Sequence, residues 1–212
     1  MEIYLVRHGE TDWNRAHRLQ GKSDTELNEY GRELAGITGR AMEDKPIDLI
    51  FSSPLIRAYE TACLIRGHRN IRIVRDDRIK EICFGDYEGM ETEVLSKDGS
   101  GRLNAFFADP DRYDPPVGGE SIDELRARTQ SFLDEMILPC EGRYDHVMIV
   151  AHGACNSSIR LNMLKLPNDQ FWKGAYQNNC CVSTIELENG VYTMQDECRT
   201  YYDAKPNPLF AG

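Results

Sequence analysis

Positive charge is scarce in this sequence. Its 212 residues include 25 Lys and Arg against 35 Asp and Glu, which gives a formal net charge of −10 at pH 7. No basic stripe offsets this balance, so the composition argues against nucleic acid as a general partner. If the protein binds an anion, it must gather positive charge at one place.

Long hydrophobic runs are also missing. A membrane-spanning helix needs about 18 consecutive apolar residues, whereas the longest apolar run, Val147–Ala151, has the length of a strand. Near the start of the chain, the acidic Glu2 stands where a secretory signal would be basic, and Arg7 and His8 follow. We therefore expect no membrane partner and a cytoplasmic location.

Paired cysteines and metal-binding spacings are absent as well. The seven cysteines are scattered without a C-x-x-C pair; they are Cys63, Cys83, Cys140, Cys155, Cys180, Cys181 and Cys198. Such a set favours reduced thiols over a disulfide framework, and the adjacent Cys180 and Cys181 are expected to be strand residues that face opposite ways. The sequence has neither an H-x-x-x-H spacing for zinc nor an acidic ligand set for Mg²⁺ at the candidate site. We expect no metal and no cofactor.

What the sequence does contain is an alternation of short apolar runs with helical segments. The runs that predict strands are residues 2–6, 48–51, 71–74 and 146–151, and the segments that predict helices are residues 29–43, 54–66, 121–138 and 154–164. This alternation predicts an α/β fold, a three-layer sandwich with a mainly parallel central sheet and helices on both faces. Asn189-Gly190 between two further runs, 182–187 and 191–194, is a two-residue hairpin signal. An antiparallel hairpin is therefore expected at one edge, near the C-terminus.

A few residues mark the expected helix ends. Pro54 suits the first turn of a helix, and Ser121 with Glu124 three residues later forms a capping box for the segment that Pro139 stops. Glu120, just before this cap, is interpreted as a charge that the helix dipole favours.

Residues 1–212 are expected to form a single domain, because the chain shows no internal repeat and no long linker. Residues 91–116 are polar and end in Asp-Pro-Pro, and they are interpreted as an insertion or cap over the sheet. Whether this cap moves as a lid is left open. Residues 201–212 contain two prolines and no periodicity, so we expect a surface tail.

Residues of unusual chemistry follow the predicted strands. After the first, second, third and fourth strands come Arg7 with His8, Arg57, Glu81, and His152 with Gly153. In an open parallel sheet, ligands bind beyond the carboxyl ends of the strands. Two histidines, two arginines and a glutamate are therefore expected to converge there.

This set of side chains favours phosphate chemistry. The guanidinium of arginine pairs with phosphate through two parallel hydrogen bonds and stays charged at any working pH. A histidine beside such arginines suggests phosphoryl transfer through a phosphohistidine, with the arginines neutralising the transition state. The carboxylic acid would protonate the leaving alcohol.

Beyond these single residues, an ordered series of motifs runs through residues 1–165. It consists of Arg7-His8-Gly9-Glu10-Thr11, Leu19-Gln20-Gly21, Ser52-Ser53-Pro54-Leu55-Ile56-Arg57, Glu81 with Phe84-Gly85-Asp86-Tyr87-Glu88-Gly89, Gly118-Gly119-Glu120-Ser121 and Val150-Ala151-His152-Gly153. The series resembles that of the histidine phosphatase superfamily, in the branch that includes the cofactor-dependent phosphoglycerate mutases. The family fold is an α/β sheet with helices on both sides, as the alternation also predicts.

The resemblance implies a role for each matching residue. His8 would be the nucleophile that becomes phosphorylated, and Glu81 the general acid that later acts as the base for water. The phosphoryl oxygens would be held by Arg7, Arg57 and His152. The other implied substrate-binding residues are Asn14 as a neutral donor, Gln20 with Gly21 at the rim, and Gly153. Members of the family need no metal, and the implied partner is a small phosphorylated metabolite.

The segment after Glu81 bears on the type of reaction. In the mutases of the family an Arg-His-Tyr-Gly stretch follows the acid glutamate, and further basic residues hold a second anionic group. Here the segment Ile82–Gly89 is acidic and contains no arginine, so it resembles the broad-specificity phosphatase branch. In the insertion, Lys97 and Arg102 are interpreted as surface charges.

The sequence thus predicts a metal-independent phosphomonoesterase of the histidine phosphatase type. The alternatives are a phosphoglycerate mutase and a non-catalytic phosphate-binding regulatory module. The regulatory module would be expected to lack a catalytic residue, and none of the five is missing. An oligomer is possible, but its state is not encoded in any readable motif.

Overall fold

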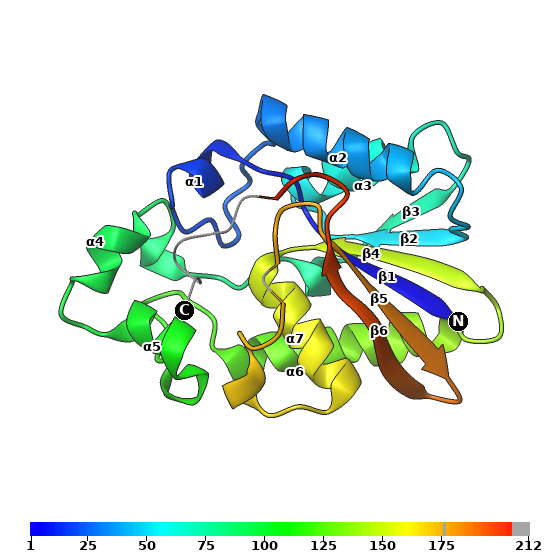
Figure 1. The fold of residues 1–212 in the computed structure, drawn as a ribbon. Helices are drawn as coiled ribbons and strands as arrows, with labels where there is room; N and C mark the ends of the chain where they lie inside the picture. Colours follow the sequence, from blue (N-terminus) through cyan, green and yellow to red (C-terminus); the bar gives the residue numbers. More distant parts are fainter. Residues whose placement is uncertain (176, 205–212) are drawn as a thin grey trace.

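The centre of the molecule is a six-stranded sheet, seen in a computed structural model that describes residues 1–175 and 177–204 (Figure 1). The strands are β1 (Glu2–Arg7), β2 (Leu49–Ser52), β3 (Arg72–Arg75), β4 (His146–Ala151), β5 (Val182–Glu188) and β6 (Val191–Arg199). Their order is β3-β2-β4-β1-β5-β6; the first four are parallel, β5 is antiparallel to β1, and β6 is antiparallel to β5. The predicted mainly parallel sheet with an antiparallel edge hairpin is confirmed.

The alternation of side chains along β1 explains why both faces of the sheet are buried. Ile3 and Leu5 belong to one hydrophobic core, whereas Tyr4 and Val6 belong to a second core on the other side. Strand β4 is buried from Val147 onward, which is typical of a parallel strand between two layers of helices.

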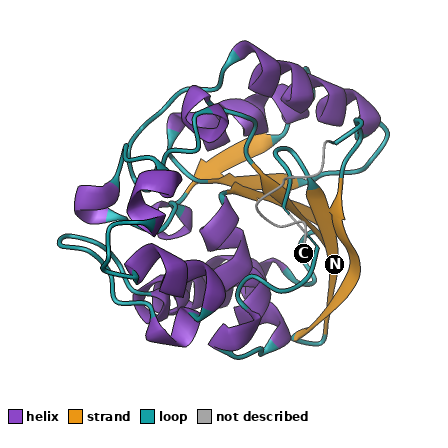
Figure 2. Cartoon of the chain, turned by 60° about the vertical axis from the view of Figure 1, so that its left-hand side comes forward, coloured by secondary structure: helices purple, strands orange, loops and turns teal. Residues whose placement is uncertain are grey.

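Helices cover both faces, as Figure 1 and Figure 2 show. Helices α2 (Glu29–Ala41) and α3 (Ile56–Arg66) lie on one face, and α6 (Ile122–Phe132) and α7 (Gly153–Leu164) lie on the other. The predicted three-layer sandwich is therefore confirmed. The remaining helices and turns are α1 (Asp12–Arg15), α4 (Thr92–Ser96), α5 (Arg102–Ala108), η1 (Asp77–Ile79), η2 (Gly85–Tyr87), η3 (Pro110–Arg112), η4 (Leu133–Ile137), η5 (Leu138–Cys140) and η6 (Asn168–Gln170).

Helix α3 begins two residues later than Pro54 predicts. Leu55 is the N-cap and has an extended backbone, so the proline lies outside the helix. The first N–H of the helix, that of Ile56, donates to the carboxylate of Asp24 at 2.7 Å. A cap from a residue this distant in the sequence leaves no local signal.

The later elements also differ from their predicted bounds. The segment that begins at Ser121 is α-helical only to Phe132 and continues as the π-helical turn η4. Strand β6 extends to Arg199 because its polar residues keep pairing with β5. Cys180 and Cys181 were expected within a strand, and this is wrong: both precede β5, and Cys180 has φ of +57°.

Residues 91–116 form α4, α5 and η3, beyond the carboxyl ends of the parallel strands (Figure 1). Phe106 anchors this part in a third hydrophobic core, where its ring contacts that of Trp172. Lys97 pairs with Glu93 of the same helix, and Arg102 pairs with Asp114. Both cations are thus surface charges, as expected.

The expected surface tail, residues 201–212, is described only as far as residue 204, and the rest lies outside the described residues. Tyr202 packs against a small core formed by Leu34, Ala35 and Cys180. Its hydroxyl donates to the Asn179 carbonyl at 2.5 Å. The beginning of the tail is therefore fixed to the body of the protein.

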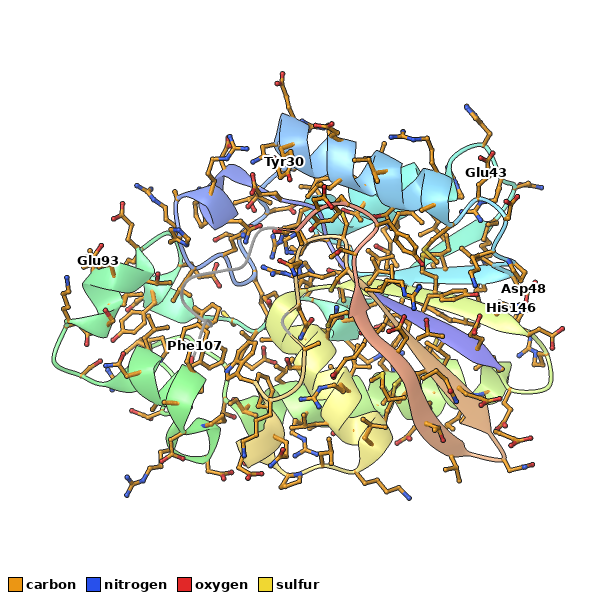
Figure 3. All side chains as sticks on the ribbon, viewed as in Figure 1. Tyr30, Glu43, Asp48, Glu93, Phe107 and His146 are labelled. Carbon is orange, nitrogen blue, oxygen red and sulfur yellow. The ribbon has the colours of Figure 1, made fainter. Side chains whose placement is uncertain are left out.

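The amino ends of the strands carry no part of the candidate site. Figure 3 shows Asp48 and His146 side by side at this end of the sheet. The Asp48 carboxylate accepts from the N–H groups of Asp145 and His146 at 2.9 and 2.8 Å, which ties the start of β4 to the start of β2.

None of the helices in the described part of the chain has the length and hydrophobicity that a membrane-spanning segment needs.

Candidate active site

The register of the sheet brings the predicted residues together. Arg7 is opposite Ala151 in the β1–β4 pair, and Ser52 is opposite Val150 in the β2–β4 pair. The residues that follow these strands therefore meet at one edge. The rings of His8 and His152 lie 5.1 Å apart, centroid to centroid.

His8 presents a nitrogen lone pair to this edge. Its Nδ1 lies 2.6 Å from the carbonyl oxygen of Gly9, and a carbonyl only accepts, so Nδ1 carries the proton and Nε2 is unprotonated. Burial, followed by the charges of Arg57 and Arg7, lowers the pKa of His8 well below its usual value. The ring is thus neutral at pH 7, which is the state that a nucleophile requires.

His152 is completely buried beside His8. Its Nε2 lies 2.8 Å from the hydroxyl of Ser53, and its Nδ1 has no hydrogen-bond partner among the described residues. Burial, followed by the charges of Arg57, His8 and other neighbours, lowers the pKa of His152 as well. The second imidazole is therefore also neutral at pH 7.

Arg57 extends from the second position of α3 and is fully buried. Its guanidinium donates to the carbonyls of Ser23 at 2.7 Å and Gly21 at 2.8 Å, and its Nε has no partner in the described part of the chain. Burial lowers the pKa of Arg57 to about 10, although Glu81 and other carboxylates oppose the shift. The side chain therefore stays cationic at pH 7 inside the protein.

Arg7 is held from the other side by residues just before β5. Its Nη1 donates to the carbonyl of Gln177, whose own side chain donates to the Gly153 carbonyl at 3.2 Å. Asn179 donates to the carbonyl of His8 at 3.0 Å. The Nε of Arg7, like that of Arg57, lacks a partner among the described residues.

Glu81 reaches the N-terminus of α7. Its carboxylate accepts from the N–H groups of Ala154 at 3.2 Å and Cys155 at 2.9 Å, where a negative charge suits the helix dipole. A Cβ built on Gly153 would lie 3.8 Å from both the Glu81 Oε2 and the Arg7 Nε. The carboxylate and the guanidinium therefore converge on Gly153.

Glu88 fixes the loop that holds Arg57. Its carboxylate accepts from the N–H groups of Lys22 and Ser23, both at 2.9 Å, and from that of Phe84 at 3.2 Å. Gly21 has φ of +54°, and a Cβ there would lie 2.0 Å from the carboxylate. Only glycine fits this approach.

Two of the predicted binding residues have local partners. The Oδ1 of Asn14 accepts from the Thr11 N–H at 3.1 Å and completes the capping box of α1. The Oε1 of Gln20 accepts from the Thr25 hydroxyl at 2.5 Å. Their roles toward a substrate remain predictions, whereas Gly21 supports Arg57 through its carbonyl.

Several residues of this arrangement escaped the sequence analysis. Ser53 and Glu88 lie within recognised motifs, yet nothing in their spacing reveals what they contact. The interpretation of Glu120 as a helix-dipole charge is wrong, because its carboxylate pairs with Arg128 at 2.6 Å. Gln177 contributes a backbone carbonyl, and this contact depends on no side-chain type.

The arrangement can bind a tetrahedral oxyanion beside a nucleophile. Three buried nitrogens without a described partner, Arg7 Nε, Arg57 Nε and His152 Nδ1, belong to side chains that surround His8. The two guanidinium groups are cationic and lie in a partly buried site, where electrostatic attraction is stronger than in water. Within the described residues, no group of three or more His, Cys, Asp or Glu side chains could hold a metal ion.

Comparison with known proteins identifies relatives along nearly the whole chain. The family described as Histidine phosphatase superfamily (branch 1) matches residues 3–198. Phosphoserine phosphatase 1 of Hydrogenobacter thermophilus is 30% identical over 192 residues, or 89% of this chain and 87% of that protein. A 2,3-bisphosphoglycerate-dependent phosphoglycerate mutase of Rhizobium meliloti is 33% identical over 178 residues, or 81% of this chain and 83% of that protein.

The fold has a close counterpart among solved structures. Bacillus stearothermophilus YhfR superimposes with a TM-score of 0.86 at 32% sequence identity, over 92% of this chain and 96% of that one.

Proposed function

Because the chain belongs to the histidine phosphatase superfamily (branch 1) as one of its phosphatases, we propose that it hydrolyses phosphate monoesters of small metabolites through a phosphohistidine on His8. The observation that carries the proposal is the state of His8. Its Nδ1–H donates to the Gly9 carbonyl. The lone pair on Nε2 is therefore free to attack a phosphoryl group at the place where the cationic side chains converge.

The first step transfers the phosphoryl group to His8. The Nε2 lone pair attacks phosphorus, the bond between phosphorus and the leaving oxygen breaks, and a protonated Glu81 gives its proton to that oxygen. As positive charge develops on the ring, the bond from Nδ1–H to the Gly9 carbonyl stabilises it.

The phosphoryl oxygens are held by the side chains that surround His8. The guanidinium groups of Arg7 and Arg57 and the imidazole of His152 donate to them. The hydroxyl of Ser53 accepts a hydrogen bond from the Leu55 N–H at 3.3 Å and can donate one to Nε2 of His152. His152 would then carry its ring proton on Nδ1, the nitrogen without a described partner.

The second step returns the enzyme to its starting state. Water attacks the phosphorus of the phosphohistidine, and the ionised Glu81 takes a proton from that water. The bond between phosphorus and Nε2 breaks, its electron pair returns to the ring, and inorganic phosphate leaves. The side chains and the backbone of this chain supply the charge stabilisation at each step, so we propose that the reaction needs no metal and no cofactor.

Contacts near Glu81 favour hydrolysis over mutase activity. A mutase must also hold the second anionic group of a phosphoglycerate, and in the mutases a basic stretch directly after the acid contributes to this. Here Ile82 and Phe84 of that segment are buried apolar residues, and the Glu88 carboxylate lies against the loop of Ser23. A carboxylate at this place repels a second anion.

The proposal is tested by hydrolysis of p-nitrophenyl phosphate with EDTA present, together with trapping of acid-labile phosphoenzyme. We expect turnover and a phosphoenzyme in the wild type, and loss of both in His8→Gln, whose amide can still donate to Gly9. His146→Gln, at the opposite end of the sheet, is the matched control and should retain both. An active His8→Gln protein would overturn the mechanism.

Parallel assays separate the two alternatives. Interconversion of 3- and 2-phosphoglycerate, with and without 2,3-bisphosphoglycerate, would identify a mutase. Phosphate binding without turnover would identify a non-catalytic module.

The predicted cytoplasmic location is compatible with the seven free thiols, because a reducing compartment maintains them.

A further inference from the structure

We infer that Arg128 is a positioning residue, which with Glu120 fixes the segment that carries Glu81. The inference rests on the role proposed above for Glu81 as acid and base. Its basis is the set of hydrogen bonds that Arg128 makes to the backbone of this segment.

Arg128 lies at the end of the second turn of α6 and donates to three backbone carbonyls of one short segment. Its Nη1 contacts the carbonyls of Arg78 at 2.6 Å and Lys80 at 2.8 Å, and its Nη2 contacts that of Glu81 at 3.0 Å. Its side chain is 17% exposed. A single, mostly buried guanidinium therefore satisfies three acceptors around the proposed acid.

Glu120 holds the remaining edge of the guanidinium. Its Oε1 accepts from Arg128 Nε at 2.6 Å and its Oε2 from Nη2 at 2.9 Å. Oε2 also accepts from the Cys83 N–H at 3.1 Å, while the Glu120 N–H donates to the Cys83 carbonyl at 2.8 Å. The Glu120–Arg128 pair thus binds the backbone both before and after Glu81.

This fixation matters because the segment has little regular structure of its own. The nearest element before Glu81 is the single turn η1 (Asp77–Ile79), and residues 80–83 are in neither helix nor strand. The Glu81 carboxylate must stay on the N-terminus of α7 and also reach the leaving oxygen. A shift of about 1 Å in a catalytic group can cost about a hundredfold in rate.

Arginine suits this role better than lysine. Five N–H donors in a rigid plane can serve three carbonyls and a carboxylate at once, whereas an ammonium has three donors on a flexible stem. Arg128→Lys should therefore retain the charge and lose the geometry. Arg128→Met should lose both while keeping much of the apolar stem.

The test exploits the difference between good and poor leaving groups. A poor leaving group needs its oxygen protonated, and p-nitrophenolate does not. We expect Arg128→Met to lower kcat/KM for glycerol 3-phosphate by about 100-fold and kcat/KM for p-nitrophenyl phosphate by no more than about threefold. The ratio kcat/KM is the measured quantity because it reports transfer to His8 and excludes the hydrolysis of the phosphohistidine, which both substrates share. Arg128→Lys and Glu120→Gln should show the same selectivity with smaller losses.

Arg126 provides the matched control on the same helix. Its side chain donates to Asn162 at 3.1 Å and Asn168 at 2.7 Å, and neither contact involves the Glu81 segment. Arg126→Met removes two side-chain hydrogen bonds of the same helix, so it should lower the unfolding temperature without changing the ratio of the two kcat/KM values. A general loss of stability is thereby separated from a loss of positioning.

Glu81→Gln distinguishes failure of the inference from failure of its premise. If Glu81→Gln lowers kcat/KM only for the alkyl phosphate and the Arg128 variants lower it equally for both substrates, the inference alone is overturned. If Glu81→Gln shows no selectivity while phosphohistidine still forms, the proposed role of Glu81 and the inference both fail. Should Arg128→Met not fold, Arg128→Lys and Glu120→Gln decide by the same ratio.

Discussion

The two buried imidazoles of the site predict a loss of stability in mild acid. His8 is 3% exposed and His152 is fully buried, and the pKa of each lies well below its usual value, first of all because of burial. In the unfolded chain both rings bind a proton near pH 6.5. Below that pH the unfolded state takes up protons that the folded state does not, so the free energy of unfolding decreases as the pH falls.

The size of the effect follows from this difference in proton uptake. A ring that stays neutral in the folded state contributes a loss of about 1.4 kcal/mol of stability between pH 7.5 and 5.5, and most of the loss occurs below pH 6.5. Two such rings together cost about 2 to 3 kcal/mol. This is a substantial part of the roughly 5–15 kcal/mol that stabilises a typical domain.

Urea unfolding at fixed temperature measures this dependence. The midpoint should fall from pH 7.5 to 5.5 in phosphate-free buffer, because a bound anion would favour protonation of the rings and stabilise the folded state. His8→Gln and His152→Gln should each remove about half of the decrease, and the double variant should remove nearly all of it. A wild-type free energy of unfolding that stays constant over this range would refute the assignment of two neutral, buried imidazoles.

Two further substitutions test the support of the site. Glu88→Gln places an amide where a carboxylate accepts from Lys22, Ser23 and Phe84. The free energy of unfolding, measured with urea, should fall by about 1–3 kcal/mol. KM should rise, because the carbonyls of that loop hold Arg57. An unchanged KM would separate the loop from the site. Gly153→Ala has room for its methyl group, at 3.8 Å from Arg7 and Glu81. Its free energy of unfolding should therefore change by less than about 1 kcal/mol, while KM rises about tenfold; an unaltered KM would mean that substrate does not approach Gly153.

The fold could be predicted because local patterns agree with tertiary structure. The run His146–Ala151 is a strand with the predicted bounds, and Asn189-Gly190 forms the hairpin turn with φ of +53° and +76°. The start of α3 could not be predicted, because Asp24 caps it from another part of the chain. Alternation and turn chemistry are local properties, whereas this cap is a tertiary contact.

The same distinction holds for the site. His8 and His152 could be predicted because each follows a strand, and the register of a parallel sheet brings strand ends together. The contacts of Arg128 could not be predicted, since backbone carbonyls occur at every residue and leave no mark in the sequence. Its carboxylate partner, Glu120, is eight residues away and has a simpler local interpretation as a helix-dipole charge.

The kind of partner that each arginine has explains how a chain of net charge −10 can attract phosphate. Arg7 and Arg57 are held by the backbone carbonyls of Gln177, Gly21 and Ser23, which orient the guanidinium and leave its full charge unpaired. Other arginines pair with carboxylates that neutralise them, as Glu120 does for Arg128 and Asp76 does for Arg78. Acidic residues can therefore outnumber basic ones over the whole chain without weakening the site, provided that no carboxylate pairs with Arg7 or Arg57.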